Sequence, residues 1–208
     1  MSEIVVQKFG GTSVGTVDRI DSVAEIIKNA SKSNKIVVVV SAMGGETNRL
    51  VDLAKAFGDD PDKREFDALV STGETVSSAL LTMALHSKGV KAKSFSASQI
   101  SMRTTSSYSK AKILDVDAKK ILDVVENDTI PIITGFQGVT EGGDVTTLGR
   151  GGSDTTAVAI AAQISAIRCD IYTDVDGIFT TDPSVVPNAK KLDSITMEEM
   201  LELSLIHI

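Results

Sequence analysis

The sequence contains Thr146-Thr147-Leu148-Gly149-Arg150-Gly151-Gly152-Ser153-Asp154-Thr155-Thr156-Ala157, a stretch that joins a polar loop to the apolar run 157–164. Three glycines within four positions allow the backbone of this loop to approach a ligand closely. The N–H groups at the start of the following helix and the planar guanidinium of Arg150 suit a carboxylate or a phosphate. Taken alone, the stretch fits equally well a helix that Ser153 caps after a flexible loop.

Two earlier glycine loops follow runs of apolar residues. The first is Lys8-Phe9-Gly10-Gly11-Thr12-Ser13, and the second is Ser41-Ala42-Met43-Gly44-Gly45, which follows five consecutive apolar residues. Uninterrupted apolar residues are typical of strands buried on both faces of a parallel sheet. Because ligands of open α/β sheets bind beyond the carboxyl ends of the strands, we expect both loops, Gly135 and residues 149–154 to meet at one end of the sheet.

The rest of the chain alternates between strand and helix patterns. Apolar runs predict strands over 4–9, 35–41, 91–96, 130–134 and 169–173, and helical spacing predicts helices over 17–30, around 50–54, over 66–88 with an interruption at 71–74, over 116–126 and from 157. Residues 97–110 are predicted to form an exposed loop or hairpin, and a hairpin is predicted around 141–144. A capping box at 196–199 predicts a final helix. The alternation predicts an α/β fold with a largely parallel sheet covered by helices on both faces.

Composition excludes several classes of function. With 208 residues, 42% of them hydrophobic, the chain is expected to form one domain. A net charge of −7 and scattered basic residues argue against nucleic-acid binding and favour a small ligand. The single cysteine, Cys169, predicts no internal disulfide and no zinc site. We find no signal peptide and no apolar run approaching the ~20 residues of a membrane span, so a cytoplasmic protein without a membrane partner is expected.

Several charged residues near these loops are candidates for chemistry. The first loop is not a Walker A motif because Lys8 precedes the glycines, but a lysine at the end of a buried strand can still neutralise a transferring phosphoryl group. Asp154 would hold such a lysine or orient a metal, or it would only interact favourably with the positive end of the helix dipole. Glu74 fits a first-turn helix acid that needs no further role. Asp174 and Asp176 would ligate magnesium, contact a ribose or only shape a turn.

Five motifs together resemble one known family. They are Lys8-Phe9-Gly10-Gly11-Thr12-Ser13-Val14, Ser41-Ala42-Met43-Gly44, Ser71-Thr72-Gly73-Glu74, Thr147-Leu148-Gly149-Arg150-Gly151-Gly152-Ser153-Asp154 and Tyr172-Thr173-Asp174-Val175-Asp176-Gly177-Ile178. In this order, over residues 4–203, they are similar to the catalytic domain of aspartokinases in the amino-acid-kinase superfamily. The resemblance implies a three-layer αβα sandwich with ATP towards the C-terminal half of the domain. It implies ATP-dependent phosphorylation of the side-chain carboxylate of L-aspartate to 4-phospho-L-aspartate, the first step towards lysine, threonine and methionine.

The same resemblance assigns roles to individual residues. As catalytic residues it implies Lys8 and Lys190, which bind the transferring phosphoryl group, and Asp154, which holds the lysines in place. The implied ATP and phosphate contacts are Lys8, Gly10, Gly11, Ser13, Thr173, Asp174, Asp176 and Lys190. The implied aspartate contacts are Ser41, Thr47, Glu74, Arg150, Gly151, Gly152 and Ser153, with Arg150 on the α-carboxylate. Mg²⁺ would bridge the ATP phosphates, and no protein metal ligand is predicted.

Alternatives to this function remain open from the sequence. A sibling kinase for acetylglutamate, glutamate or UMP has the same fold and glycine loops, and a non-catalytic nucleotide-binding or partner-binding module is also compatible. Residues 1–203 are expected to be a catalytic domain that is incomplete at its C-terminal end, since residues 204–208 do not match the family and no ACT regulatory domain follows. Such a chain is expected to self-associate and to turn over slowly. A homo-oligomer is possible, and no feedback effector is implied.

Overall fold

The computed structural model describes residues 3–174, 177, 179–181, 185–186 and 188–196. The chain divides into two compact units, residues 1–173 and 174–208, and each is described by itself. All the helices and strands named below belong to the first unit. The helix predicted after Thr196 and the segment 204–208 lie outside the described residues.

A five-stranded parallel sheet forms the centre of the first unit, in the order β3-β6-β2-β1-β9. Its strands are β1 (Ile4–Phe9), β2 (Lys35–Val40), β3 (Ala92–Phe95), β6 (Ile130–Thr134) and β9 (Arg168–Tyr172). In β2 every residue after Lys35 is buried, as expected for a central strand covered on both faces. All five strands were predicted at these positions.

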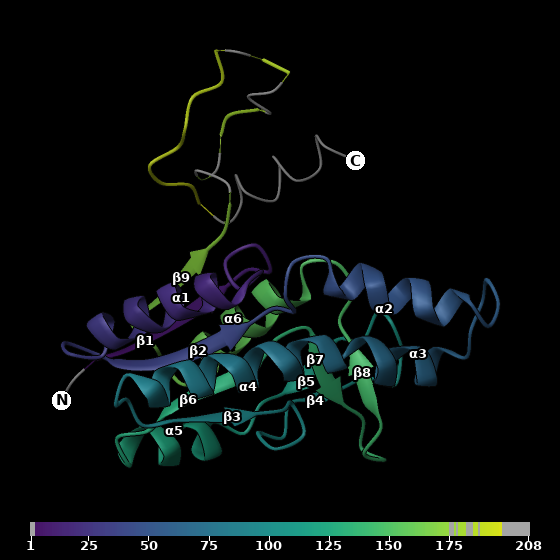
Figure 1. The fold of residues 1–208 in the computed structure, drawn as a ribbon, viewed down its shortest axis with the longest axis horizontal. Helices are drawn as coiled ribbons and strands as arrows, with labels where there is room; N and C mark the ends of the chain where they lie inside the picture. The colour runs from purple at the N-terminus through teal and green to yellow at the C-terminus, as the bar shows by residue number, and fades with distance from the viewer. Residues whose placement is uncertain (1–2, 175–176, 178, 182–184, 187, 197–208) are drawn as a thin grey trace. The chain divides into compact units, whose positions relative to one another are not determined.

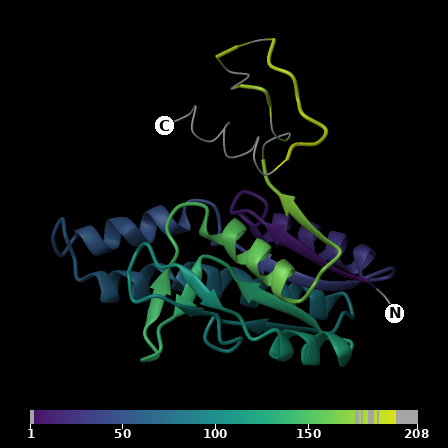
Figure 2. The same cartoon turned by 180° about the vertical axis from the view of Figure 1, so that it is seen from behind.

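Helices cover both faces of this sheet, which confirms the three-layer αβα sandwich. The helices α1 (Val17–Ala30) and α4 (Thr72–Ser87) lie on one face, and α5 (Ala118–Glu126) and α6 (Gly152–Gln163) lie on the other (Figures 1 and 2). Because side chains alternate along a strand, Val38 and Val40 pack with Ile20 and Leu81, whereas Val37 and Val39 join the second core with Ile160.

A second, four-stranded sheet has the order β5-β4-β7-β8. It consists of β4 (Arg103–Thr104), β5 (Ile113–Asp115), β7 (Gln137–Val139) and β8 (Val145–Thr147). The antiparallel pair β7 and β8 is the hairpin predicted around 141–144. The prediction that 97–110 is exposed was wrong in part, because Ala97, Ile100 and Met102 are buried in the core beside α5 and α6. These apolar residues follow no regular period, so their burial leaves no pattern in the sequence.

Two further helices, α2 (Glu46–Lys55) and α3 (Lys63–Val70), complete the first unit. Residues Lys63–Ser87, which include α3 and α4, are long and apolar enough to cross a membrane by length and composition, and half of the 18-residue stretch that meets this criterion is buried. The sequence analysis did not identify this run. In the fold α4 packs against α1 and β3 and buries Leu81 and Leu85 completely, which is the packing of a core helix.

Candidate active site

The carboxyl ends of the parallel strands bring the glycine loops together, as predicted. A Cβ atom built on Gly11 would lie 2.9 Å from the carbonyl oxygen of Ala42, and one built on Gly135 would lie 2.6 Å from Ser153 Oγ. The backbone N–H of Gly10 donates a hydrogen bond of 2.9 Å to the carbonyl of Tyr172. The loops after β1, β2 and β6 and the start of α6 therefore pack closely against one another, with no room for a side chain at Gly11 or Gly135.

Because of this close packing, we expect a side chain at position 11 to destabilise the fold. Alanine at position 11 would place its Cβ against a backbone carbonyl, which cannot move away like the end of a side chain. We expect Gly11→Ala to lower the free energy of unfolding by roughly 1–3 kcal/mol, the usual cost of overpacking. Urea denaturation measures it. Gly142→Ala is the matched control, since only Thr140 Oγ1 lies within reach, at 3.7 Å; equal losses in the two variants would contradict the packing argument.

Lys8 and Asp154 form an ion pair where these loops meet. Lys8 is the penultimate residue of β1, and its Nζ lies 2.7 Å from Asp154 Oδ1 in the first turn of α6. The lysine side chain is 7% exposed, whereas that of Asp154 is 45% exposed. The carboxylate thus holds a largely buried ammonium group in place, which agrees with the predicted contact between these two residues. An anion arriving at this point would meet a fixed positive charge.

The loop after β1 adds free backbone donors beside Lys8. The N–H groups of Gly11 and Thr12 form no hydrogen bond within the described part of the chain. A Cβ on Gly10 would lie 3.6 Å from Lys8 Nζ, so glycine leaves room for a ligand next to the ammonium group. Ser13 Oγ donates to the carbonyl of Tyr172 at 3.4 Å. Free N–H groups beside a lysine form a suitable site for phosphate oxygens.

The loop after β2 leads into α2 in a similar way. Gly45 has φ = +82° and precedes α2, which has no side-chain cap. The N–H groups of Gly44 and Thr47 are without hydrogen-bond partners among the described residues. Thr47 is half-buried in the first turn of α2, and the carbonyl of Ser41 accepts a 2.6 Å hydrogen bond from Ser77 Oγ. Ser41 and Thr47 therefore lie in one loop and helix start at the same end of the sheet.

Glu74 lies in the first turn of α4 and is only 3% exposed. Its Oε1 accepts a hydrogen bond of 3.0 Å from the N–H of Ala42, in the loop after β2, but its buried Oε2 has no partner among the described residues. Burial raises the pKa of this carboxyl to about 7, although hydrogen bonds from the N–H groups of Ala42 and Glu74 itself oppose the shift. A buried carboxylate oxygen without a partner is costly, and a cationic ligand group would satisfy it. The interpretation of Glu74 as an ordinary first-turn acid does not explain this burial.

The loop 147–152, here called the Arg150 loop, begins beside the second sheet and ends at α6. Gly149 and Gly151 adopt left-handed φ values of +82° and +71°. The helix begins at Gly152 with no side-chain cap, so the alternative in which Ser153 is the N-cap was wrong; Ser153 lies inside the helix and is buried against Gly135. The N–H groups of Arg150, Gly151 and Ser153 form no hydrogen bond in the described structure.

The side chain of Arg150 is exposed and has no ion pair within the residues that the structure describes. Other arginines do have carboxylate partners: Arg49 pairs with Glu46, and Arg103 pairs with Asp115. An exposed guanidinium beside three free N–H groups is available to bind an anion.

The remaining predicted residues lie at or beyond the boundary between the units. Thr173 is the last residue of the first unit, and its Cα would lie 4.0 Å from a Cβ on Gly10. Asp174 and Lys190 belong to the second unit, where Lys190 accepts a hydrogen bond from Thr180 through its carbonyl and donates one to Thr180 Oγ1. Asp176 lies outside the described residues. The predicted contact between Asp154 and Lys190 therefore stays a prediction.

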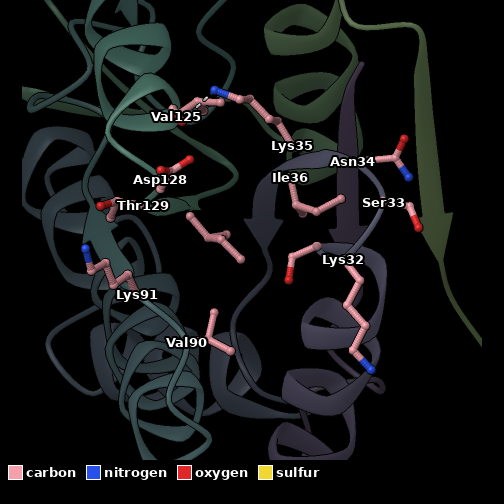
Figure 3. Close-up of a pocket in the computed structure, with 12 residues that line it drawn as sticks. Lys32, Ser33, Asn34, Lys35, Ile36, Val90, Lys91, Val125, Asp128 and Thr129 are labelled. Atoms are coloured by element: carbon pink, nitrogen blue, oxygen red, sulfur yellow. Dashed lines mark hydrogen bonds between the residues drawn. The ribbon is translucent and has the colours of Figure 1, made fainter. Parts of the chain in front are cut away.

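A cavity of about 280 Å³ lies at the opposite end of the sheet (Figure 3). Its lining includes Lys35, Lys91 and Ile130, at the amino ends of β2, β3 and β6. The ammonium group of Lys35 donates to the carbonyl of Val125 at 3.3 Å. This cavity is separate from the glycine loops, so it has no part in the candidate active site. Over the described residues, no group of three His, Cys, Asp or Glu side chains is placed to hold a metal ion.

One buried acid that the sequence analysis did not single out connects to the Arg150 loop. Asp67, in α3, is completely buried and accepts four hydrogen bonds from Ser109 and Thr147. Its sequence neighbours give no signal for this role, because both partners are far along the chain.

Comparison with known proteins identifies the family. The model of the amino acid kinase family matches residues 3–206, nearly the whole sequence. The chain belongs to the amino acid kinase family. This confirms the resemblance inferred from the five motifs.

This chain has several relatives that are named aspartate kinase or aspartokinase. It is 55% identical over 202 residues to an aspartate kinase of Pseudomonas putida, covering 97% of this chain and 49% of the relative. The crystal structure of aspartate kinase from Synechocystis superposes with a TM-score of 0.87 at 46% identity, covering 98% of this chain and 33% of that one. The crystal structure of E. coli aspartokinase III in complex with aspartate and ADP superposes with a TM-score of 0.88 at 32% identity, covering 98% of this chain and 56% of that one. The chain spans about half the length of the curated relatives that it matches.

Proposed function

We propose that this chain is the catalytic part of an aspartate kinase, which transfers the γ-phosphoryl group of ATP to the side-chain carboxylate of L-aspartate. The observation that carries the proposal is the Lys8–Asp154 pair, placed where the glycine loops meet. The relatives named aspartate kinase and the E. coli complex with aspartate and ADP support this choice within the family.

Phosphoryl transfer to a carboxylate requires little covalent participation from the protein. A side-chain oxygen of aspartate forms the new bond to the γ-phosphorus, the bond from that phosphorus to the β,γ-bridging oxygen breaks, and ADP leaves with the electron pair. Charge on the transferring group is spread over its oxygens, so positioning and electrostatic stabilisation provide the catalysis. Lys8, held by Asp154, would neutralise that charge, and the N–H groups of Gly11 and Thr12 would bind phosphate oxygens. Gly10 would leave room for them, Ser13 would lie beside them, and Lys190 would be a second phosphate-binding cation.

Recognition of aspartate would use the opposite charges of Arg150 and Glu74. The exposed guanidinium of Arg150 suits two-point binding of the α-carboxylate, with the free N–H groups of Gly151 and Ser153 and the small Gly152 beside it. The unpartnered Oε2 of Glu74 suits the α-ammonium group. Ser41 and Thr47 would complete the contacts from the loop after β2.

ATP would also contact Thr173, Asp174 and Asp176, and Mg²⁺ would accompany its phosphates. When bound, the metal ion neutralises part of the phosphate charge. Homo-oligomerisation, a cytoplasmic location and the absence of nucleic-acid and membrane partners remain predictions.

The raised pKa of Glu74 predicts that aspartate binds more tightly as pH rises. The substrate's ammonium group pairs with the ionised carboxylate, and that form becomes populated as pH passes about 7. Aspartate affinity measured by calorimetry should therefore increase from about pH 6 to about pH 8. In Glu74→Gln the affinity should be lower and nearly independent of pH over this range. An unchanged pH dependence in the variant would show that Glu74 does not contact the ammonium group.

The same group predicts a change of stability with pH. A carboxyl whose pKa is raised on folding from 4.5 to about 7 stabilises the fold fully below its unfolded pKa, and this contribution is lost as pH rises through the folded value. Relative to Glu74→Gln, the free energy of unfolding of the unmodified chain should fall by roughly 2 kcal/mol from about pH 5.5 to about pH 8. Urea denaturation at both pH values tests this; a difference that stays constant would mean that Glu74 titrates normally in the fold.

A substrate panel distinguishes aspartate from the substrates of sibling kinases. ADP release with ATP and Mg²⁺ should depend on L-aspartate and should be far slower with acetylglutamate, glutamate or UMP. If UMP or acetylglutamate supports the faster release, the sibling assignment replaces ours. Release of ADP that no acceptor stimulates, or nucleotide binding without turnover, would favour a hydrolase or a non-catalytic module.

A further inference from the structure

The carboxylate of Asp67 is completely buried, and both of its oxygens have two hydrogen-bond donors. Oδ2 accepts from the backbone N–H groups of Ser109 and Thr147, each at 2.8 Å. Oδ1 accepts from the hydroxyl groups of the same two residues, at 3.0 and 2.9 Å. Among the ion pairs recorded for the described residues, none includes Asp67. A buried carboxylate held only by neutral donors has one geometry in which all its partners are satisfied.

The two segments that Asp67 holds are themselves in contact. The N–H of Ala111 donates to the carbonyl of Thr147 at 2.9 Å, and the carbonyl of Ser109 would lie 3.3 Å from a Cβ on Gly149. Ser109 has φ = +63°, a left-handed conformation that a serine adopts at a cost unless its surroundings hold it there. Its two hydrogen bonds to Asp67 provide that restraint.

Asp67 therefore connects α3 to the first residue of the Arg150 loop. On the other side, α3 ends at Val70 and α4 begins at Thr72, so Glu74 follows Asp67 by two helical turns. Gln137 reinforces this junction, because its Nε2 donates to the carbonyl of Ser71 at 2.9 Å. The junction of α3 and α4 thus determines the separation between the Arg150 loop and Glu74.

We infer that Asp67 is a positioning residue for amino-acid recognition, which fixes the Arg150 loop at the correct distance from Glu74. The inference rests on the proposed function, because it requires Arg150 and Glu74 to bind the two charged groups of one substrate. Over the described residues, the hydrogen bonds of Asp67 go to Ser109 and Thr147 and not to the loop after β1. Loss of the Asp67 carboxylate should weaken aspartate binding and leave ATP binding largely unchanged.

Asparagine at position 67 offers a conservative replacement. Its Oδ1 would accept from the two N–H groups, and its Nδ2 would donate to the hydroxyl oxygens of Ser109 and Thr147, which can turn to accept. All four contacts are then retained without the charge. Alanine loses all four and leaves the buried N–H of Thr147 and the partly buried N–H of Ser109 without partners.

The kinetic test compares Asp67→Ala, Asp67→Asn and the control Asp52→Ala, an exposed acid on α2. We expect Asp67→Ala to raise KM for aspartate at least ~10-fold, since small displacements of a positioning group have large effects, with KM for ATP changed by less than about threefold. Asp67→Asn should stay within about threefold of the unmodified chain for both substrates. Equal rises for ATP and aspartate, or an Asn variant as impaired as the Ala variant, would overturn the inference.

Amide hydrogen exchange provides a second test that does not require turnover. In Asp67→Ala the peptides that include Ser109 and Thr147 should exchange at least ~10-fold faster, while those of β1 and β2 stay protected, and Asp67→Asn should retain the protection. Unchanged exchange at both sites in the Ala variant would overturn the inference even if aspartate is the substrate. Faster exchange in a chain whose unmodified form shows no aspartate-dependent ADP release would instead reject the proposed function and retain the role of Asp67 in holding the loop.

Discussion

Lys8→Ala is expected to lower kcat by at least ~100-fold, the scale of removing one preorganised group that stabilises a developing charge. The side chain of Lys8 is 7% exposed and its ammonium group is held by Asp154, so it requires little reorganisation when the phosphoryl group transfers. Its contribution should be larger in the transition state than in the bound substrates, and the loss should appear in kcat more than in KM for aspartate.

A second lysine of the same sheet controls for loss of charge. Lys35 lies at the start of β2, and its ammonium group donates to the carbonyl of Val125 at the end of the sheet away from the glycine loops. Lys35→Ala should keep kcat within about twofold. Thermal melting should show that Lys8→Ala remains folded, because its partner Asp154 is 45% exposed and can be solvated. A folded Lys8→Ala variant with near-normal kcat would reject the assignment of Lys8.

Arg150→Lys is expected to raise KM for aspartate at least ~10-fold and to leave KM for ATP nearly unchanged. Lysine keeps the positive charge but loses the planar, two-point contact with a carboxylate. Since Arg150 is exposed and has no ion pair within the described residues, the substitution should not disturb the fold.

The measurement is the pair of KM values, with Arg103→Lys as the control. Arg103 pairs with Asp115 on the surface of the second sheet and should tolerate the change. A rise confined to KM for ATP would place Arg150 at the nucleotide. That result would remove the basis for aspartate binding by the Arg150 loop, and with it the inference for Asp67.

The main sheet and the meeting of the glycine loops could be predicted because their signals are local. Continuous apolar runs identify buried strands, and parallel strands place their following loops at one end, so the proximity of Lys8 to Asp154 follows from topology. The second sheet could not be predicted in full. Its strands β4 and β5 contain two and three residues, too few to show a period.

Asp67 and Glu74 show the limit of sequence reasoning for buried acids. Both lie in helices, where an acid is usually exposed. The partners of Asp67 are 42 and 80 residues away, and the partner of Glu74 is 32 residues away, so only the tertiary structure reveals that these carboxylates are buried. The start of α6 was misjudged for a related reason: the left-handed Gly151 begins the helix before Ser153 can cap it.

Trapping of the product with hydroxylamine tests the central claim most directly. An acyl phosphate reacts with hydroxylamine to give a hydroxamate, whereas ADP and inorganic phosphate do not. The chain should be incubated with ATP, Mg²⁺ and L-aspartate, both as it stands and joined to the part of the Pseudomonas putida relative that it does not match, because it spans 49% of that protein. Mass spectrometry should detect the side-chain hydroxamate of aspartate in amounts equal to the ADP released, and Lys8→Ala should abolish it. Release of ADP without hydroxamate, or a hydroxamate on the α-carboxylate, would contradict the proposed reaction.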